Sequence, residues 1–341
     1  MSFMESAVLL HLCAPATWRL ALAAGSVAPP SLLREGFVHL STPGQVKIPA
    51  NAIYAGRTDL VALVVDPARL PHELRYEPAV DGSSPGVVFP HHYGPVPVGS
   101  VVAVLPYPPG PDGRFTDPAA PPAPDDATAR VHLFDRALAQ RCAADVRPVT
   151  GGVALLDPRF PASEEYNTVW LSGPCDAATV AAETGTVLGA TAHQRVVLDD
   201  HATAGALDGL GWAVAARHLM AWNPAAPATC SRDVVPVAGD ESLADAVLRV
   251  VHLALLDAQR EPIAAARLHV DGATAAIRPV PTGPARQPDL TAPLARHCVA
   301  HAQAIGCDVV FVSAADDDQR DRYAALGFCG VATRYEATRQ R

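Results

Sequence analysis

Three histidines lie beside short apolar segments in the N-terminal part of the chain. His11 lies in "LLHLC", His39 in "FVHLS" and His91 in "VFPHHYG". Because side chains two apart on a strand point to the same face, His39 and Ser41 share one face of a predicted strand. Imidazoles and a hydroxyl that meet on adjacent strands can hydrogen-bond a polar ligand. Each histidine alone would fit the edge of an apolar core. The hypothesis of a binding cleft therefore depends on the three histidines and Ser41 taken together.

Three charged residues extend this candidate site, namely Arg57, Arg75 and Glu77. Glu77, in "LRYE", is a carboxylate near a predicted strand end and could stabilise an oxocarbenium-like ribose. A solvated strand edge explains it equally well. The histidines lack a regular ligand spacing, so we predict no metal site.

The elements that must position these residues are short. In the first hundred residues we predict helices at 17–24 and 43–55, and strands at 7–13, 36–41, 60–65, 74–77, 87–90 and 100–105. Pro49 falls in the middle of the second helix and should disturb it.

From residue 130 onwards, helical and strand patterns alternate. We predict helices at 130–146, 176–185, 202–211, 240–257, 291–306 and 318–326. We predict strands at 151–157, 167–171, 193–199, 212–220, 262–270, 273–280, 308–313 and 333–337. The acidic run 316–318 should cap the last helix. The fold class is therefore α+β, with a mixed α/β layer in the C-terminal part.

A proline-rich segment, residues 106–129, divides the chain, and such composition is typical of a semi-rigid spacer. We predict a domain at 1–107, a linker at 108–129, and a region at 130–341 that divides again into 130–229 and 230–341. No convincing internal repeat is found.

Composition excludes several classes of function. The chain has 341 residues, 49% of them hydrophobic, and a net charge of −9 without a basic run, which argues against nucleic-acid and anionic-membrane partners. Lys47 is the only lysine, which excludes most lysine chemistry. The seven cysteines form no C-x-x-C pair, and no secretory or membrane-spanning pattern is found, so we expect a cytoplasmic protein with a small-molecule substrate. The oligomeric state is left open.

The ordered segments "EGFVHLSTPGQV", "GRTDLVALVVDPARLPHELRYE" and "VVFPHHYGPVPVG" resemble the bacterial family called domain of unknown function 952, over about residues 7–107. This resemblance implies a relation to the ADP-ribosyltransferase fold, near the branch that includes RNA 2′-phosphotransferases. It implies a split β-sheet whose cleft holds NAD or an ADP-ribose-like ligand. His11 would contact a ribose, with His39 and Ser41 beside it and His91 on the opposite wall. We therefore expect His39 and Glu77 to be catalytic, and His11, Ser41, Arg57 and His91 to bind the ligand.

Residues 130–341 resemble the Gcn5-related N-acetyltransferases (GNAT), most strongly from residue 262 onwards, in "AAARLHVDGATAAIRPVPT" and "GCDVVFVSAADDDQRDRYAALGF". This resemblance implies that acetyl-CoA binds where two parallel strands splay, with its pyrophosphate at a helix N-terminus. Tyr323 matches the tyrosine that often protonates the leaving thiolate. Arg278 stands where related sequences often have a glutamate base, and arginine cannot replace it. Residues 130–229 would be an accessory or degenerate half.

The loop that would hold the pyrophosphate corresponds to residues 286–291. Its cofactor-binding positions would be Arg286, Gln287, Leu290 and Thr291. The two glycines of the usual pattern are missing, Pro288 removes an N–H donor and Asp289 adds a negative charge. The fold resemblance is therefore stronger than the cofactor resemblance.

Three functions follow. The first is acetyl-CoA-dependent N-acyltransfer to an unknown amine, with Tyr323 as general acid. The second is an NAD- or ADP-ribose-dependent activity of the N-terminal domain with a non-catalytic GNAT-like scaffold. The third is metabolite binding or protein interaction without catalysis. The first function is ranked ahead because most GNAT-like proteins are acyltransferases. The second is supported by the more complete set of motifs, in the N-terminal domain.

Overall fold

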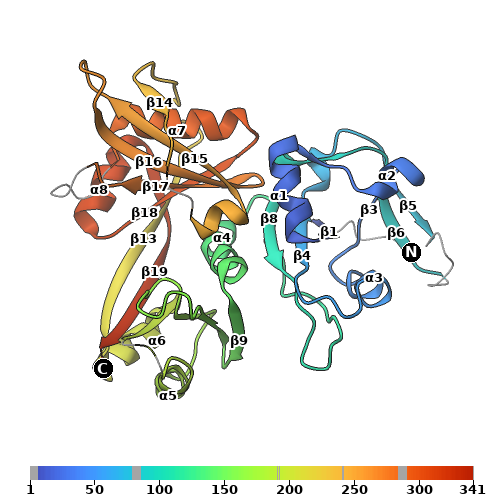
Figure 1. The fold of residues 1–341 in the computed structure, drawn as a ribbon, viewed down its shortest axis with the longest axis horizontal. Helices are drawn as coiled ribbons and strands as arrows, with labels where there is room; N and C mark the ends of the chain where they lie inside the picture. Colours follow the sequence, from blue (N-terminus) through green and yellow to red (C-terminus); the bar gives the residue numbers. More distant parts are fainter. Residues whose placement is uncertain are drawn as a thin grey trace. The chain divides into compact units, whose positions relative to one another are not determined.

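The computed structural model describes residues 7–78, 86–189, 191, 193–239, 242–282 and 290–340, and Figure 1 shows its elements. The chain forms two compact units. The first comprises Met1–Phe134 and Pro227–Val310, and the second comprises Asp135–Ala226 and Phe311–Arg341. Helix α4 (Ala127–Cys142) begins in the first unit and ends in the second. These units differ from the predicted domains, because they group segments that are far apart in the sequence.

The N-terminal part of the first unit contains two three-stranded antiparallel sheets. One has the order β1 (Leu9–Cys13), β4 (Val61–Val65), β8 (Val101–Pro106). The other has the order β3 (Val38–His39), β6 (Val88–His92), β5 (Leu74–Pro78). The short strands β2 (Ser26–Val27) and β7 (Val96–Pro97) pair separately. An isolated bridge between Leu10 and Ser41 joins the segment after β3 to β1, with two backbone hydrogen bonds of 2.8 and 2.9 Å.

Three helices accompany these sheets: α1 (Pro15–Ala24), α2 (Pro30–Arg34) and α3 (Lys47–Ile53). Helix α1 ends, as predicted, at Ala24, and the residue that caps it, Gly25, adopts φ +83°. Helix α3 is shorter than predicted and begins at Lys47, so Pro49 lies in its first turn. Because N–H groups of the first turn have no partner within a helix, Pro49 does not disturb α3. This corrects the expectation of a damaged helix.

The proline-rich segment is not a free spacer. Phe115 is 2% exposed and belongs to the apolar core of the N-terminal sheets, where its ring stacks on Tyr107 at 5.3 Å. The side chain of Asn51, on α3, donates to the carbonyl of Phe115 and accepts from its N–H. Phe115 and Asn51 therefore attach this part of the segment to the N-terminal sheets, since burial of an aromatic ring is favourable.

The C-terminal part of the first unit is an antiparallel sheet with the order β14 (Val234–Pro236), β15 (Arg249–Leu256), β16 (Pro262–Asp271), β17 (Thr274–Val280). Helix α7 (Ala292–Ala304) packs on β15, β16 and β17. The predicted helix at 240–257 is wrong, because this segment forms β15 after a single helical turn at Leu243–Ala246. The apolar run "RVVHLALL" fits the residue period of a helix as well as that of a strand. Pairing with β16 makes it a strand.

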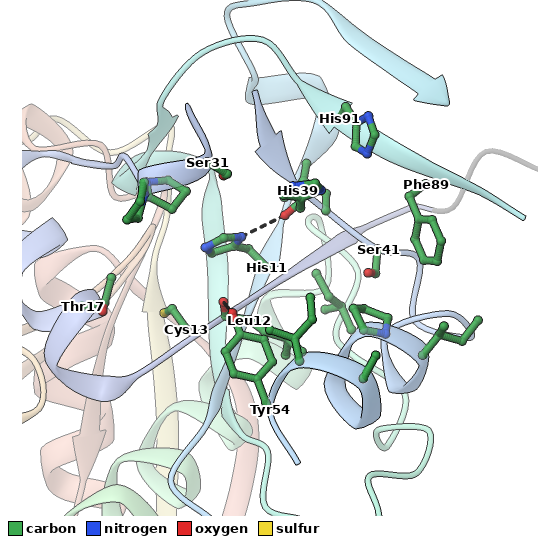
Figure 2. A pocket seen from close by; sticks show the side chains of 18 of the residues that line it. His11, Leu12, Cys13, Thr17, Ser31, His39, Ser41, Tyr54, Phe89 and His91 are labelled. Carbon is green, nitrogen blue, oxygen red and sulfur yellow. Dashed lines mark hydrogen bonds between the residues drawn. The ribbon is translucent and has the colours of Figure 1, made fainter. Parts of the chain in front are cut away.

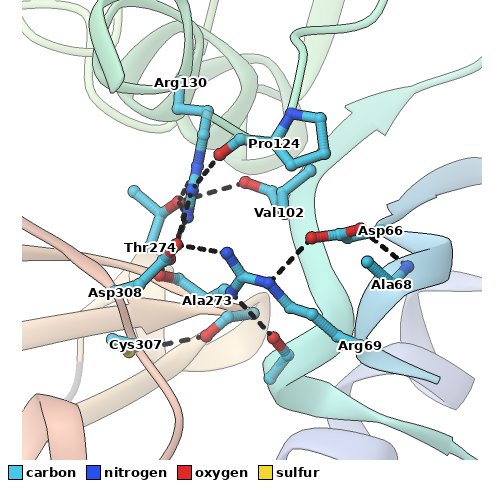
Figure 3. Close-up of polar contacts among 12 residues, drawn as sticks. Asp66, Ala68, Arg69, Val102, Pro124, Arg130, Ala273, Thr274, Cys307 and Asp308 are labelled. Carbon is cyan, nitrogen blue, oxygen red and sulfur yellow. Dashed lines mark hydrogen bonds and ion pairs between the residues drawn. The ribbon is translucent and has the colours of Figure 1, made fainter. Parts of the chain in front are cut away.

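Several contacts join the two parts of the first unit (Figure 3). Arg130, which is 1% exposed, donates to Asp308, to the carbonyl of Ala273 and to Thr274. Arg69 also forms an ion pair with Asp308. The indole N–H of Trp18 donates to the buried carboxylate of Asp271 at 2.8 Å.

The second unit contains a sheet whose strand order is β9 (Asp145–Val149), β10 (Gly152–Leu156), β11 (Thr168–Leu171), β12 (His193–Leu198), β19 (Phe328–Gln340), β13 (Ala213–Trp222), β18 (Val309–Ala314). The first two residues of β18 belong to the first unit. Its helices are α5 (Ala177–Val187), α6 (His201–Gly209) and α8 (Asp317–Leu326). Strands β11 and β12 are parallel, and the other pairs are antiparallel. The predicted α+β class is confirmed.

The order of elements repeats along the chain. The series β9-β10-β11-α5-β12-α6-β13 and β15-β16-β17-α7-β18-α8-β19 both read three strands, helix, strand, helix, strand. The final strands are exchanged, since β19 pairs with β12 of the first series and β13 pairs with β18 of the second. No repeat was predicted from the sequence, because the order of elements recurs without a recognisable repeat of residues.

Candidate binding site

A cavity of about 680 Å³ lies in the N-terminal part of the first unit (Figure 2). It is lined by residues of β1, α1, α2, β3, α3, β6 and the segments between them. The structure brings five of the predicted residues together around it: His11, His39, Ser41, Arg57 and His91. Phe89 contributes an aromatic wall.

Strand pairing explains this convergence. The bridge between Leu10 and Ser41 places the hydroxyl next to the strand that carries His11. His39 of β3 and His91 of β6 are direct register partners, and their rings lie edge to face with centroids 5.1 Å apart. Three segments that are distant in the sequence therefore present polar side chains to one cavity.

His11 is buried and has a defined tautomer. Its Nδ1 atom lies 2.9 Å from the carbonyl oxygen of His39, as drawn in Figure 2. Because a carbonyl only accepts, Nδ1 carries the proton and Nε2 keeps a lone pair. Burial lowers the pKa of His11 below its ordinary value, so the imidazole is neutral at pH 7.

His91 is 2% exposed and forms a hydrogen bond with a carboxylate that does not line the cavity. Its Nδ1 atom lies 3.0 Å from Oε2 of Glu77, and its ring stacks on Phe37 at 4.0 Å. The hydroxyl of Tyr93 donates to the same carboxylate oxygen at 2.8 Å. Burial lowers the pKa of His91, and the hydrogen bonds from His91 and Tyr93 lower the pKa of Glu77.

The rim of the cavity is charged. His39 is half-exposed, and its Nε2 atom lies 2.9 Å from Oε2 of Glu35. Arg57 forms two hydrogen bonds with Asp59, at 2.7 and 2.9 Å. Arg34, in the last turn of α2, also lines the cavity. Arg34 was not among the predicted residues, although it lies four residues before the "VHLS" motif.

Two predicted residues do not line the cavity. Glu77 contacts His91 instead, so any action of its carboxylate on a ligand passes through that imidazole. Arg75 pairs with Glu73 at 2.6 Å and lies over the ring of Tyr93, 4.5 Å from its centroid.

The predicted acyltransferase residues are dispersed or outside the described part of the chain. Tyr323 of α8 is fully buried, with its ring centroid 6.3 Å from that of Phe328. Leu290 is buried, and Thr291 is the N-terminal cap of α7. The predicted positions Arg286 and Gln287 lie outside the described residues, as do Pro288 and Asp289.

Two further acidic residues, Asp316 and Glu183, have local partners. Asp316 caps α8 by accepting from the N–H of Gln319 at 2.8 Å, which confirms the predicted role of the acidic run. Glu183 accepts from both the N–H and the hydroxyl of Thr150. Within the described ranges, no group of three or more His, Cys, Asp or Glu side chains is arranged to hold a metal ion. Among the helices described, none combines the length and the apolar composition needed to cross a membrane.

Residues 12–104 match the family model described as "Protein of unknown function (DUF952)", which confirms the predicted resemblance of the N-terminal part. No curated protein matches the sequence. Protein CC0527 from Caulobacter crescentus is 28% identical over 32% of this chain and 93% of that chain, with a TM-score of 0.29.

Two further similar solved structures carry an acetyltransferase name. A GCN5-related N-acetyltransferase from Kribbella flavida is 15% identical over 63% of this chain and 95% of that chain, with a TM-score of 0.46. A tandem GNAT protein from the clavulanic acid biosynthesis pathway is 11% identical over 65% of this chain and 89% of that chain, with a TM-score of 0.36.

Proposed function

We propose that the N-terminal part binds a ribose-containing nucleotide, of the NAD or ADP-ribose type, in the cavity described above. One observation carries the proposal: His11, His39, Ser41 and His91 converge from separate strands on a single cavity of about 680 Å³. Volumes of roughly 300–1,000 Å³ are usual for small-molecule sites.

The chemistry of the lining supports this ligand class. Two buried, neutral imidazoles offer acceptor nitrogens, which suit the hydroxyl groups of a ribose. Phe89 and the apolar residues around it suit a flat base. Arg34 and Arg57 at the rim suit phosphate groups, although a phosphate would have to compete with Asp59 for Arg57.

The relation to ADP-ribosyltransferases is part of this proposal. In it, the two three-stranded sheets joined at Leu10 and Ser41 are the halves of a split sheet, and the cavity beside the joint holds the nicotinamide ribose. His39 would then act on the ligand from the rim. The proposal covers binding first, and transfer of an ADP-ribosyl group second.

Ligand-dependent thermal unfolding of the full chain tests the proposal. A ligand that binds only the native state stabilises it by RT ln(1 + [L]/Kd), which is about 2.7 kcal/mol at a hundredfold excess over Kd. We expect NAD or ADP-ribose to raise Tm, and nicotinamide alone, which has no ribose, to leave it unchanged. His11→Ala should remove the shift, whereas the matched control His201→Ala, an exposed histidine of α6, should keep it. Unchanged Tm with both nucleotides would contradict the proposal.

A second candidate is acetyl-CoA-dependent N-acyltransfer by the C-terminal region. The series β15-β16-β17-α7-β18-α8-β19, in which β17 precedes α7 along the chain, favours it. In this proposal Tyr323 protonates the leaving thiolate, and its burial requires that the thioester enter the interior of the fold. Acetyl-CoA should then raise Tm, and Tyr323→Phe should abolish turnover of an amine acceptor while leaving that shift in place. If neither ligand changes Tm, the third function, an interaction protein without catalysis, is favoured.

A further inference from the structure

A second layer of polar residues lies behind the histidines of the cavity. Glu77 of β5 does not line the cavity. Its carboxylate oxygen Oε2 accepts hydrogen bonds from Nδ1 of His91 at 3.0 Å and from the hydroxyl of Tyr93 at 2.8 Å. The three residues belong to the β5–β6 pair and the turn that follows it, so the sheet itself fixes their relative positions.

This arrangement determines where the proton of His91 lies. The carboxylate of Glu77 is ionised at pH 7, because the hydrogen bonds it accepts lower its pKa. An ionised carboxylate only accepts, so Nδ1 of His91 must be the donor. In the described part of the chain, the bond to Glu77 is the only hydrogen bond of the His91 ring. The Nε2 atom therefore keeps its lone pair, and His91 is one of the residues that line the cavity.

His11 reaches the same state by another route. Its Nδ1 donates to the carbonyl of His39, so its Nε2 atom is also an acceptor. A backbone carbonyl fixes the tautomer of His11, whereas a side chain that can be replaced fixes the tautomer of His91. This difference makes the role of Glu77 testable.

We propose that Glu77 is a positioning residue that acts through His91, holding it as the Nδ1–H tautomer so that Nε2 accepts a hydrogen bond from a ligand hydroxyl. The proposal rests on the nucleotide-binding function proposed above. It adds a reason why the cavity would select one class of ligand. With both Nε2 atoms as acceptors, the cavity favours ligands with neighbouring hydroxyl donors. Tyr93 supports this arrangement because it fixes the orientation of the carboxylate.

The charged groups around His91 determine how it responds to pH. Glu77 on β5 and Glu35 after α2 favour its protonated form, whereas His39 on β3 and burial disfavour it. Arg75 and Tyr93 face Glu77. Replacement of Glu77 removes a group that favours protonation, so His91 stays neutral in Glu77→Gln. The variant therefore changes the tautomer and not the charge.

The first experiment is made without ligand, by ¹⁵N NMR of the full chain labelled at histidine, with the His91 signals assigned from their absence in His91→Phe. At pH 7.5 we expect His91 to show a protonated Nδ1 and an unprotonated Nε2. Glu77→Gln should populate both tautomers, since the glutamine amide can donate as well as accept. Glu73→Gln, which removes a nearby carboxylate that pairs with Arg75, should leave His91 unchanged. A protonated Nε2 in the wild-type chain, or no effect of Glu77→Gln, would overturn the proposal.

The second experiment uses NAD as the probe in calorimetric titrations. Glu77→Gln should weaken binding by the inverse of the fraction of His91 that keeps the Nδ1–H tautomer, about twofold if the two tautomers are equally populated. Because Glu77 acts through His91, the same change should have no further effect in a His91→Phe background. Equal weakening in both backgrounds would show that Glu77 acts independently of His91. Absence of NAD binding to the wild-type chain would refute the proposed function alone, since the ¹⁵N result decides the tautomer without ligand.

Discussion

Burial controls the chemistry of individual side chains around the cavity. His11 and His91 are neutral because burial lowers their pKa values. Cys13 lines the same cavity, and burial raises the pKa of its thiol to about 12. Since only the thiolate is nucleophilic, a position in the cavity does not make Cys13 a catalytic nucleophile.

We expect alkylation to separate the cysteines by burial. Cys230 and Cys329 are exposed and should react with iodoacetamide at pH 8, whereas Cys13 should remain unmodified. Cys298 and Cys307, buried thiols whose pKa values are also raised to about 12, should behave like Cys13. Mass spectrometry of peptides gives the measurement, and the unfolded chain in guanidinium, where all seven thiols should react, is the control. Rapid labelling of Cys13 in the folded chain would contradict the prediction.

At the scale of elements, packing overrides local preference in several segments. Pro49 is harmless because α3 begins one turn later than its pattern suggests. The run 249–256 is a strand because β14 and β16 pair on both sides of it. The proline-rich segment is ordered by Phe115, which belongs to the apolar core.

The burial of Phe115 in the apolar core has a measurable consequence for stability. Phe115→Ala should lower the free energy of unfolding by about 3–5 kcal/mol, as expected for loss of a buried aromatic side chain. Phe160→Ala is the matched control, because Phe160 is 40% exposed and its loss should have a small effect. Urea unfolding monitored by circular dichroism gives both values. Equal effects of the two variants would mean that the segment is a spacer, as its composition alone predicts.

At the scale of the whole molecule, ion pairs join segments that are distant in the sequence. Arg69 and Arg130, from the N-terminal part of the first unit, both pair with Asp308 (Figure 3). Burial raises the pKa of Asp308, but hydrogen bonds from the two arginines outweigh it and lower that pKa to about 2. The carboxylate therefore stabilises the first unit when it is ionised.

The sign of the pH dependence follows from this pKa. Because the pKa is lower in the folded state than the ordinary value near 3.8, the stabilisation is complete above pH ~4 and is lost as the pH falls towards 2. Asp308 is 41% exposed, so solvent screening limits this pH-dependent part to about 1 kcal/mol. In urea unfolding, the difference between the wild-type chain and Asp308→Asn should be constant above pH 5 and shrink towards pH 2. Asp145→Asn, which removes an exposed pair with Arg147, should show almost no difference at any pH. If the difference in the free energy of unfolding between the wild-type chain and Asp308→Asn does not depend on pH, the lowered pKa of Asp308 is refuted.

The sequence by itself determined the types of most elements and five of the residues that line the cavity. Local patterns were sufficient for α1 with its terminal Gly25 and for the cap of α8 at Asp316, because nearby residues control these features. The motif "FVHLS" predicted that His39 and Ser41 lie together, and both line the cavity, although β3 ends at His39 and Ser41 pairs with Leu10.

Only the tertiary structure decided how these residues combine. The position of Glu77 behind His91, the contribution of Arg34 to the rim and the exchange of β13 and β19 all depend on contacts between distant segments. The same holds for the order imposed on the proline-rich segment by Asn51 and the core. Such contacts arise from burial and strand pairing across the fold, and the local pattern of residues does not encode their partners.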